Sequence, residues 1–273
     1  MSHNRIPQRF AELSAARRAG LITFITAGDP DADTTLSSMQ ALVRGGADLI
    51  ELGVPFSDPM ADGPTIQRAS ERALEGGMTL ARVLDLVRRF HETDATTPVV
   101  LMGYLNPIEC MGYERFAERA VEAGVDGVLT VDLPPEESHD CHEAFARHGL
   151  EQIYLLAPTS GEDRIRAICA RASGFVYYVS VKGVTGQKTS DAEEVQRVVS
   201  TLKGQTNLPV GVGFGIRTAE AAAVLAGFSD AVIVGSVLVE LIEQHAGNPP
   251  ELARRLEAFT RDMRTAMDAR RAA

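Results

Sequence analysis

Eight short apolar runs recur along the chain, and the segments between them carry a different, helical periodicity. The runs are rich in β-branched residues and almost free of charge, a pattern typical of parallel strands that are buried on both faces. They span residues 21–26, 48–52, 98–103, 127–132, 152–157, 175–180, 209–213 and 230–235. This alternation predicts an α/β fold.

The segments between the runs are expected to form helices. In residues 79–90 the apolar side chains fall on one helical face. Further along, Ser190 and Glu193 have the spacing of a capping box, and Gly204 is well placed to end the helix that follows.

A faint internal repeat supports the count of eight strands. Its three copies are "RGGADLIELG", "EAGVDGVLTVD" and "AGFSDAVIVG", each with a helix end, a glycine, an aspartate and a strand. Eight strands, each followed by a helix or a loop, fit a (β/α)8 TIM barrel, and such barrels reach this length as one unit. We therefore expect residues 1–273 to form a single barrel domain. A doubly wound sheet is the main alternative, but it usually has fewer strands.

Two flanking segments are additional to the barrel. The stretch "RFAELSAARRAG" predicts an extra helix before the first strand, placed to close the bottom of the barrel. The C-terminal tail predicts an extended helix with one apolar stripe that faces the core. The stripe consists of Leu252, Leu256, Phe259, Met263 and Met267.

Composition narrows the classes of function. The formal net charge is −10, and no basic run interrupts the chain, which argues against nucleic acid or an anionic membrane as the main partner. The N-terminus lacks the apolar region of a signal peptide, and no stretch approaches the ~18 apolar residues of a membrane span, so a soluble, cytoplasmic protein is expected. An odd number of cysteines without CxxC spacing indicates free thiols in a reducing compartment: Cys110, Cys141 and Cys169.

The stretch "LIELGVPFSDPMADGP" (residues 49–64) places Glu51 near the end of the second predicted strand. Active sites of barrels form at the C-terminal ends of the strands. Burial among apolar neighbours raises a carboxyl pKa, which suits a group that must both give and take a proton near neutrality. The alternative is a structural charge, which needs an equally buried partner. No cation adjoins Glu51 in sequence, although a remote partner remains possible.

Two further carboxylates follow in the loop. Asp62 precedes residues 63–64, a Gly-Pro pair at which a turn can aim the side chain back across the barrel mouth, whereas Asp58 lies in a natural exposed turn. Oxygen ligands from Glu51, Asp58 and Asp62 would suit Mg²⁺. Because no other acidic cluster joins them, the metal site is the weaker interpretation and no metal is expected.

Glycine-bearing turns follow the last three predicted strands. They are "KGVTGQ", "GFGI" and "GSV". Barrels often hold phosphate in the loops after strands seven and eight and at a nearby helix start, where glycine lets backbone N–H groups approach phosphate oxygens. The hydroxyl of Ser236 can add a hydrogen bond. The predicted substrate is a small phosphate ester with its reacting end near Glu51.

These motifs together resemble one known family. "FITAGDP", "ELGVPFSDPMADGP", "GVTG", "GFGI" and "VGS", in this order, are similar to tryptophan synthase α subunits, and the likeness runs from about residue 7 to the last helix. The resemblance implies a lyase that cleaves indole-3-glycerol phosphate to indole and glyceraldehyde 3-phosphate by a retro-aldol reaction. It makes Glu51 the general acid/base, and it makes Asp62 the group that holds the indole N–H and stabilises positive charge on the ring.

The resemblance also implies the other site residues. The phosphate-binding positions match Gly186, Gly215, Gly235 and Ser236. Residues that line the pocket or close its lid match Phe24, Tyr104, Leu129, Tyr177, Thr185 and Phe214. For the aromatic residues, simple core packing is the alternative.

The family implies a partner as well. Its members work with a β subunit in an αββα heterotetramer, and pyridoxal phosphate (PLP) belongs to that subunit, so no cofactor is expected in this chain. The matching interface loops surround residues 58–59, 106–107 and 132–135, and residues 183–191 match the lid. Two other functions stay open: another phosphate-binding barrel, such as a sugar-phosphate isomerase or epimerase, and a non-catalytic activator of the β subunit.

Overall fold

Eight parallel strands form a closed barrel within the residues that the computed structural model describes, namely 4–179, 189–213 and 215–272. The strands pair in sequence order, and β8 pairs with β1. Their bounds are β1 (Gly20–Thr26), β2 (Leu49–Gly53), β3 (Val99–Gly103), β4 (Gly127–Thr130), β5 (Glu151–Leu156), β6 (Val176–Val179), β7 (Val210–Gly213) and β8 (Ala231–Val234). Each predicted strand is present within a few residues. The TIM barrel is confirmed, and the doubly wound alternative is wrong.

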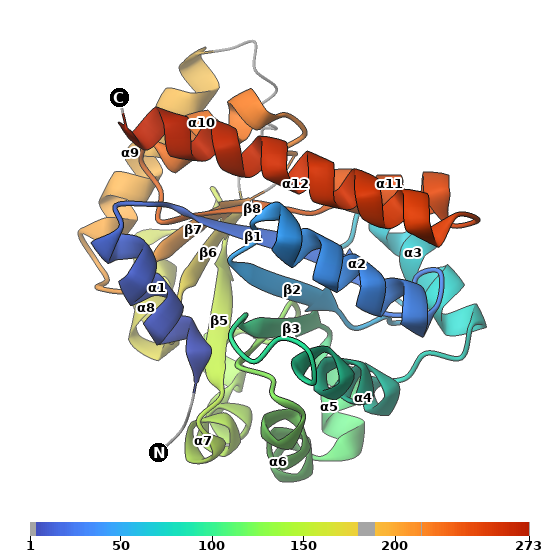
Figure 1. Cartoon of the computed structure of the whole chain (residues 1–273). Helices are drawn as coiled ribbons and strands as arrows, with labels where there is room; N and C mark the ends of the chain where they lie inside the picture. The colour runs from blue at the N-terminus through green and yellow to red at the C-terminus, as the bar shows by residue number, and fades with distance from the viewer. Residues whose placement is uncertain (1–3, 180–188, 214, 273) are drawn as a thin grey trace.

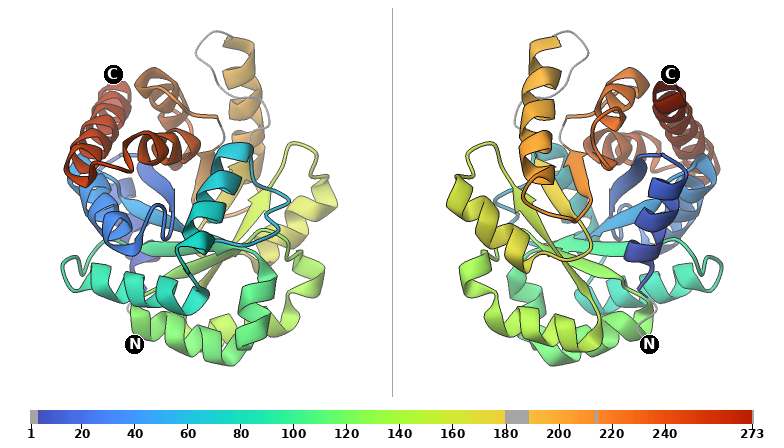
Figure 2. Two further views of the ribbon diagram at one scale, coloured as in Figure 1. Left: turned by 90° about the vertical axis from the view of Figure 1, so that its right-hand side faces the viewer. Right: turned by 90° about the vertical axis from the view of Figure 1, so that its left-hand side faces the viewer.

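Helices surround the strands on all sides (Figures 1 and 2). Their bounds are α1 (Arg5–Ala15), α2 (Ala32–Gly45), α3 (Pro64–Glu75), α4 (Leu80–His91), α5 (Leu105–Met111), α6 (Tyr113–Ala123), the 3-10 turn η1 (Pro135–Glu137), α7 (His139–His148), α8 (Glu162–Arg171), α9 (Thr189–Lys203), α10 (Ala219–Ala226), α11 (Ser236–His245) and α12 (Pro249–Ala272). The predicted helix over 79–90 is α4, with Thr79 as its N-cap. Gly204 follows the last residue of α9, as expected.

Residues of each strand alternate between the barrel interior and the layer under the helices. In β2, Leu49 belongs to the interior cluster, whereas Ile50 and Leu52 pack in the layer between the strands and the helices. Glu51 lies between Ile50 and Leu52, so it shares the inward face with Leu49. This alternation, and not any special local geometry, turns Glu51 into the barrel.

The extra N-terminal helix α1 closes the bottom of the barrel, as predicted. Its Ile6, Phe10 and Leu13 are buried and belong to the interior cluster. The ring of Phe10 lies 5.7 Å from that of Phe175, which precedes β6.

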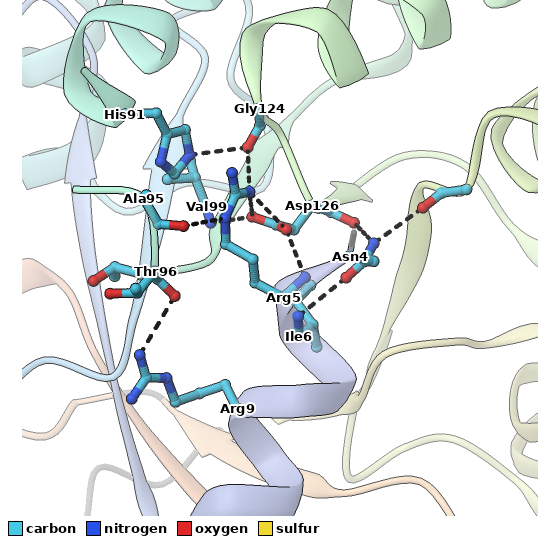
Figure 3. Close-up of polar contacts among 12 residues, drawn as sticks. Asn4, Arg5, Ile6, Arg9, His91, Ala95, Thr96, Val99, Gly124 and Asp126 are labelled. Carbon is cyan, nitrogen blue, oxygen red and sulfur yellow. Dashed lines mark hydrogen bonds and ion pairs between the residues drawn. The ribbon is translucent and has the colours of Figure 1, made fainter. Parts of the chain in front are cut away.

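The start of α1 is fixed by the close-packed polar contacts that Figure 3 shows. The Arg5 guanidinium donates to both carboxylate oxygens of Asp126 at 3.0 Å, and to the carbonyl oxygens of Ala95 and Gly124. The backbone N–H of Arg5 also donates to Asp126 at 2.8 Å. Asp126 therefore ties α1 to the N-terminal end of the barrel.

The internal repeat has a structural cause at this end. In each copy the aspartate accepts a hydrogen bond from a backbone N–H at the start of the preceding strand. The bonds run from Leu21 to Asp48 (2.8 Å), from Val99 to Asp126 (2.9 Å) and from Val210 to Asp230 (2.9 Å). Before β6, Ser173 accepts the equivalent bond from Gln152 at 2.8 Å. The repeat therefore marks every second strand of the barrel.

The C-terminal helix α12 lies along the outside of the barrel beside α2 and α10 (Figure 1). Four members of its predicted stripe are buried and Phe259 is half-buried against the core, so the core-facing assignment is confirmed. All three cysteines are free, and burial raises the pKa of Cys141 to about 12, which keeps that thiol unreactive.

Candidate active site

A cavity of about 390 Å³ opens at the C-terminal ends of the strands. Its floor is the interior cluster, against which Met102, Val131, Leu155 and Val179 pack while also lining the cavity. Several residues singled out from the sequence line the same cavity: Phe24, Glu51, Asp62, Tyr177, Gly215, Gly235 and Ser236. The structure thus brings together residues from β1, β2 and β6 and from the loops after β2, β7 and β8.

Glu51 is the most unusual of these groups. Its residue is 1% exposed, and its Oε1 atom has no hydrogen-bond partner among the described residues. Burial raises the pKa of Glu51 to about 8. The carboxyl group therefore stays largely protonated at neutral pH, poised to donate a proton and to take one back.

Asp62 sits at the end of the loop between β2 and α3. Gly63 caps α3, Pro64 occupies its first turn, and the Gln67 side chain donates to the Asp62 carbonyl at 2.9 Å. Burial raises the pKa of Asp62, and a hydrogen bond with the Tyr104 hydroxyl opposes that shift. The Tyr104 hydroxyl also accepts the Ala61 N–H at 3.0 Å, so the loop is held in place directly beside Asp62.

The predicted pocket-lining residues divide between the cavity and its surroundings. Tyr177 is buried beside Glu51, and burial together with the negative charge of Glu51 raises its pKa well above the usual value. Tyr104 lines a smaller adjoining cavity with Phe24 and Asp62, and its ring stacks on Phe56. Leu129 is fully buried in the interior cluster that forms the floor.

The loops after β7 and β8 build the end of the cavity at which the sequence predicts the phosphate. Gly215 has a φ of +69°, a conformation that favours glycine. Gly235 precedes α11, and a Cβ there would lie 3.3 Å from the Phe24 ring. Ser236 begins α11, whose first-turn N–H groups offer the donors that an anion needs. Thr185, Gly186 and Phe214 lie outside the described residues, as does the lid segment up to residue 188. Residues 189–191 of that segment belong to the first turn of α9.

A charged pair borders this end of the cavity. Arg217, four residues after β7, donates from Nη1 to Oε1 of Glu240 at 2.9 Å, and its Nη2 contacts Oε2. Both side chains line the cavity.

Comparison with known proteins decides the family. The family model described as "Tryptophan synthase alpha chain" matches residues 10–268. The chain is 58% identical to the alpha chain of Laribacter hongkongensis and 56% identical to that of Thioalkalivibrio sulfidiphilus, in each case over 97% of this chain and 100% of the relative. This chain belongs to the tryptophan synthase alpha chain family. A crystal structure of the alpha subunit from Legionella pneumophila superposes with a TM-score of 0.91 at 46% identity, covering 97% of this chain and 99% of that one.

As a tryptophan synthase alpha chain, the protein is a lyase of tryptophan biosynthesis, and its reaction is the cleavage of indole-3-glycerol phosphate to indole and glyceraldehyde 3-phosphate. The resemblance inferred from the motifs is confirmed. The sugar-phosphate isomerase or epimerase alternative is wrong, because the family match spans nearly the whole chain.

The magnesium alternative would draw its ligands from Glu51, Asp58 and Asp62. Asp58 is exposed, and its Oδ2 accepts a hydrogen bond from Ser57 at 2.5 Å. Within the described ranges, no group of three or more His, Cys, Asp or Glu side chains is placed to hold a metal ion. Over the same part of the chain, no helix is both long and apolar enough to cross a membrane.

Two ion pairs at or near the cavity were not predicted from the sequence. The first is the Arg217–Glu240 pair, although Arg217 directly follows "GFGI" and Glu240 lies one helical turn after Ser236. The second is Asp29 of "FITAGDP", which is buried and pairs with Arg72 of α3 through two hydrogen bonds of 2.8 Å. Arg72 also donates to Glu243 of α11 at 2.9 Å. Asp29 therefore fixes α3, and with it the loop that carries Asp62.

Proposed function

We propose that Glu51 is the general acid and base of indole-3-glycerol phosphate cleavage. The observation that carries the proposal is its carboxyl group, which is buried at the cavity and has a pKa of about 8. The protonated acid donates its proton to indole C3. The carboxylate then takes the proton of the glycerol hydroxyl on the adjacent carbon, as the bond from that carbon to C3 breaks. Indole and the aldehyde leave, and Glu51 has regained its proton.

Asp62 is proposed to accept a hydrogen bond from the indole N–H. Protonation of C3 places positive charge on the ring, and a carboxylate held beside the nitrogen stabilises that charge. The hydrogen bond from Tyr104, which lowers the pKa of Asp62 against the effect of burial, supports this role because it favours the ionised form.

The phosphate is proposed to bind at the start of α11. Gly215, Gly235 and Ser236 line one cavity with Glu51, which supports a substrate that spans both ends. Family resemblance extends the phosphate site to Gly186 and gives lining or lid roles to Thr185 and Phe214. The remaining proposed lining residues are Phe24, Tyr104, Leu129 and Tyr177.

The partner is proposed to be a tryptophan synthase β subunit, in an αββα heterotetramer with PLP in the β subunit and no cofactor in this chain. The expected interface loops are joined to one another: the Leu105 N–H donates to Asp132 at 2.8 Å, and the Ala61 N–H donates to Tyr104. Met60, in the loop with Asp62, is 83% exposed, so its side chain is free to contact a partner. A cytoplasmic location is proposed from the biosynthetic role.

Indole release from indole-3-glycerol phosphate, measured with and without a PLP-containing β subunit, tests both proposals. Slow release alone and a large increase with the partner are the expected results. Fast release that the partner leaves unchanged would contradict the coupling. The chain with Glu51→Gln separates catalysis from activation: it is expected to release indole at only a trace rate while still stimulating synthesis of tryptophan from indole and serine by the β subunit. Normal cleavage by that variant would remove Glu51 from the mechanism.

A further inference from the structure

The charges that line the active-site cavity are unevenly distributed. Among the lining residues that the structure describes, three carry carboxyl groups, namely Glu51, Asp62 and Glu240, and one, Arg217, carries a cation. A phosphate ester brings about two further negative charges into this space. Backbone N–H groups contribute partial charges only, so a full positive charge at the phosphate end would matter for affinity.

Arg217 is placed to supply that charge. Its partner Glu240 is the fourth residue after Ser236 in α11, and residues four apart lie on the same face of a helix, one turn from each other. The guanidinium is thereby held about one helical turn from the proposed phosphate site. The Arg217 side chain is 49% exposed, so it can turn towards the cavity without breaking a packed core.

The chemistry of the pair points the same way. A guanidinium is planar and permanently charged, and its fork of N–H donors matches carboxylate and phosphate oxygens equally well. At present both arms of the Arg217 fork contact the Glu240 carboxylate. A phosphate dianion is an acceptor of the same geometry with more charge.

We propose that Arg217 is a phosphate-recognising residue of this enzyme, and that Glu240 holds it at the cavity rim and competes with the phosphate for it. The proposal rests on the proposed function, because it assumes that phosphate binds near Ser236. Other charges that act on Glu240 come from the neighbouring turn: Arg68 attracts it and Glu243 repels it. Arg68 and Glu243 form their own pair with two hydrogen bonds of 2.9 Å.

This proposal gives the two members of one ion pair opposite effects. Arg217→Gln removes the cation and leaves Glu240 unneutralised beside the phosphate, so affinity for phosphate falls. Glu240→Gln frees the cation and removes a competing anion, so affinity rises. A purely structural ion pair would make both variants behave alike, because either change breaks the same bond.

The test is calorimetric titration of the full chain with glycerol 3-phosphate, a stable probe that carries the phosphate without the indole. Arg217→Gln is expected to weaken binding at least about tenfold, as for the loss of a charge-assisted hydrogen bond. Glu240→Gln is expected to tighten it several-fold. The matched control is Arg68→Gln, which breaks an ion pair to the same helix at a residue outside the cavity lining and is expected to change affinity far less than Arg217→Gln. In steady-state assays, Arg217→Gln should raise KM for indole-3-glycerol phosphate and leave kcat within about twofold.

Unchanged affinity in Arg217→Gln, a shift of both variants in the same direction, or the absence of saturable binding by the unmodified chain would each overturn the proposal. Melting temperatures near that of the unmodified chain show that the variants are folded, and Arg217→Lys, which keeps the charge but not the fork, is expected to recover part of the affinity. The binding assay does not depend on catalysis. Binding that requires Arg217 in a chain that releases no indole would retain the phosphate site and contradict the proposed reaction. Indole release by a chain whose phosphate binding does not depend on Arg217 would support the proposed reaction and contradict the proposal for Arg217.

Discussion

Two buried carboxyl groups three residues apart along the chain, at the start and in the middle of β2, have opposite surroundings. Asp48 directly precedes β2, at the bottom of the barrel, and Glu51 lies three residues further on, about 10 Å towards the mouth. Asp48 accepts the Leu21 N–H at 2.8 Å and pairs with Arg264 at 3.0 Å. Glu51 has burial as the cause of its raised pKa and an Oε1 atom without a partner among the described residues.

The difference indicates a structural role for Asp48 and a catalytic role for Glu51. Burial raises the pKa of Asp48 too, but the hydrogen bond from Leu21 and the charge of Arg264 oppose that rise. A carboxylate paired in this way is held in place by the fold, and removing either partner would leave an uncompensated buried charge. Within the part of the chain that the structure describes, Glu51 has no contacts that oppose the effect of burial on its pKa. Ionising its carboxyl group in the folded state is therefore costly. Such groups are found where chemistry requires them.

Replacement of Glu51 by Gln gives the largest effect on activity. The amide keeps the volume and removes proton transfer, so kcat for indole release is expected to fall by up to about 10⁴-fold. Affinity for glycerol 3-phosphate should stay unchanged, which distinguishes this loss from misfolding. A kcat within tenfold of the unmodified enzyme would contradict the role of Glu51.

The same variant should change the dependence of stability on pH. The folded pKa of Glu51 is about 8, above its ordinary value of 4.5, so the folded state binds this proton more tightly than the unfolded state. The resulting stabilisation is fully present below about pH 4.5 and is lost as pH rises through 8. In Glu51→Gln that loss is absent, and the free energy of unfolding, from urea titrations between pH 5 and pH 9, should decline less. Parallel pH profiles would contradict the raised pKa.

Replacement of Asp48 by Asn tests the other end of β2. The change leaves Arg264, which is 7% exposed, without one of its two anionic partners, and we expect the free energy of unfolding to fall by about 3 kcal/mol. Thermal unfolding should show a melting temperature lower by about 10 °C. Below the transition, kcat should match the unmodified enzyme, because Asp48 is remote from the cavity. A large loss of kcat with unchanged stability would contradict the structural role assigned to Asp48.

The contrast also shows what the sequence could and could not predict. The eight strands, the helix α4 and the place of Glu51 within a buried strand follow from local patterns, which need only neighbours in the chain. The repeat with Asp48 was visible, but its cause was not, because the bond joins each aspartate to a different strand. Arg264 is 216 residues from Asp48, and no local pattern reports such a partner. Arg217 was overlooked for the same reason, since its meaning depends on Glu240 in the next helix but one.

At the barrel mouth, replacement of Asp62 by Asn is expected to lower kcat less than Glu51→Gln does. The amide can still accept a hydrogen bond from an indole N–H, but it stabilises the cationic ring poorly, so kcat is expected to fall about 10²-fold. Stability should change little, because Asp62 has no buried cation to leave unpaired among the described residues. An unchanged rate would mean that the ring is held by another group.

The smallest effect is expected for an ion pair on the protein surface, away from both Asp48 and Glu51. Arg88, on the outer face of α4, contacts Asp85 at 2.7 Å and Glu92 at 2.6 Å, and all three side chains are more than half exposed. Short distances alone would suggest a strong interaction. Water screens exposed charges, however, and holding long side chains in place costs entropy, so Arg88→Gln should leave the free energy of unfolding nearly unchanged, with kcat unaltered. Urea unfolding of Arg88→Gln and Asp48→Asn compares the loss of an exposed ion pair with the loss of a buried one, although the contact distances in the two pairs are similar. Equal losses in the two variants would show that distance, and not burial, determines the contribution of these pairs, and the distinction drawn between Asp48 and Glu51 would lose its basis.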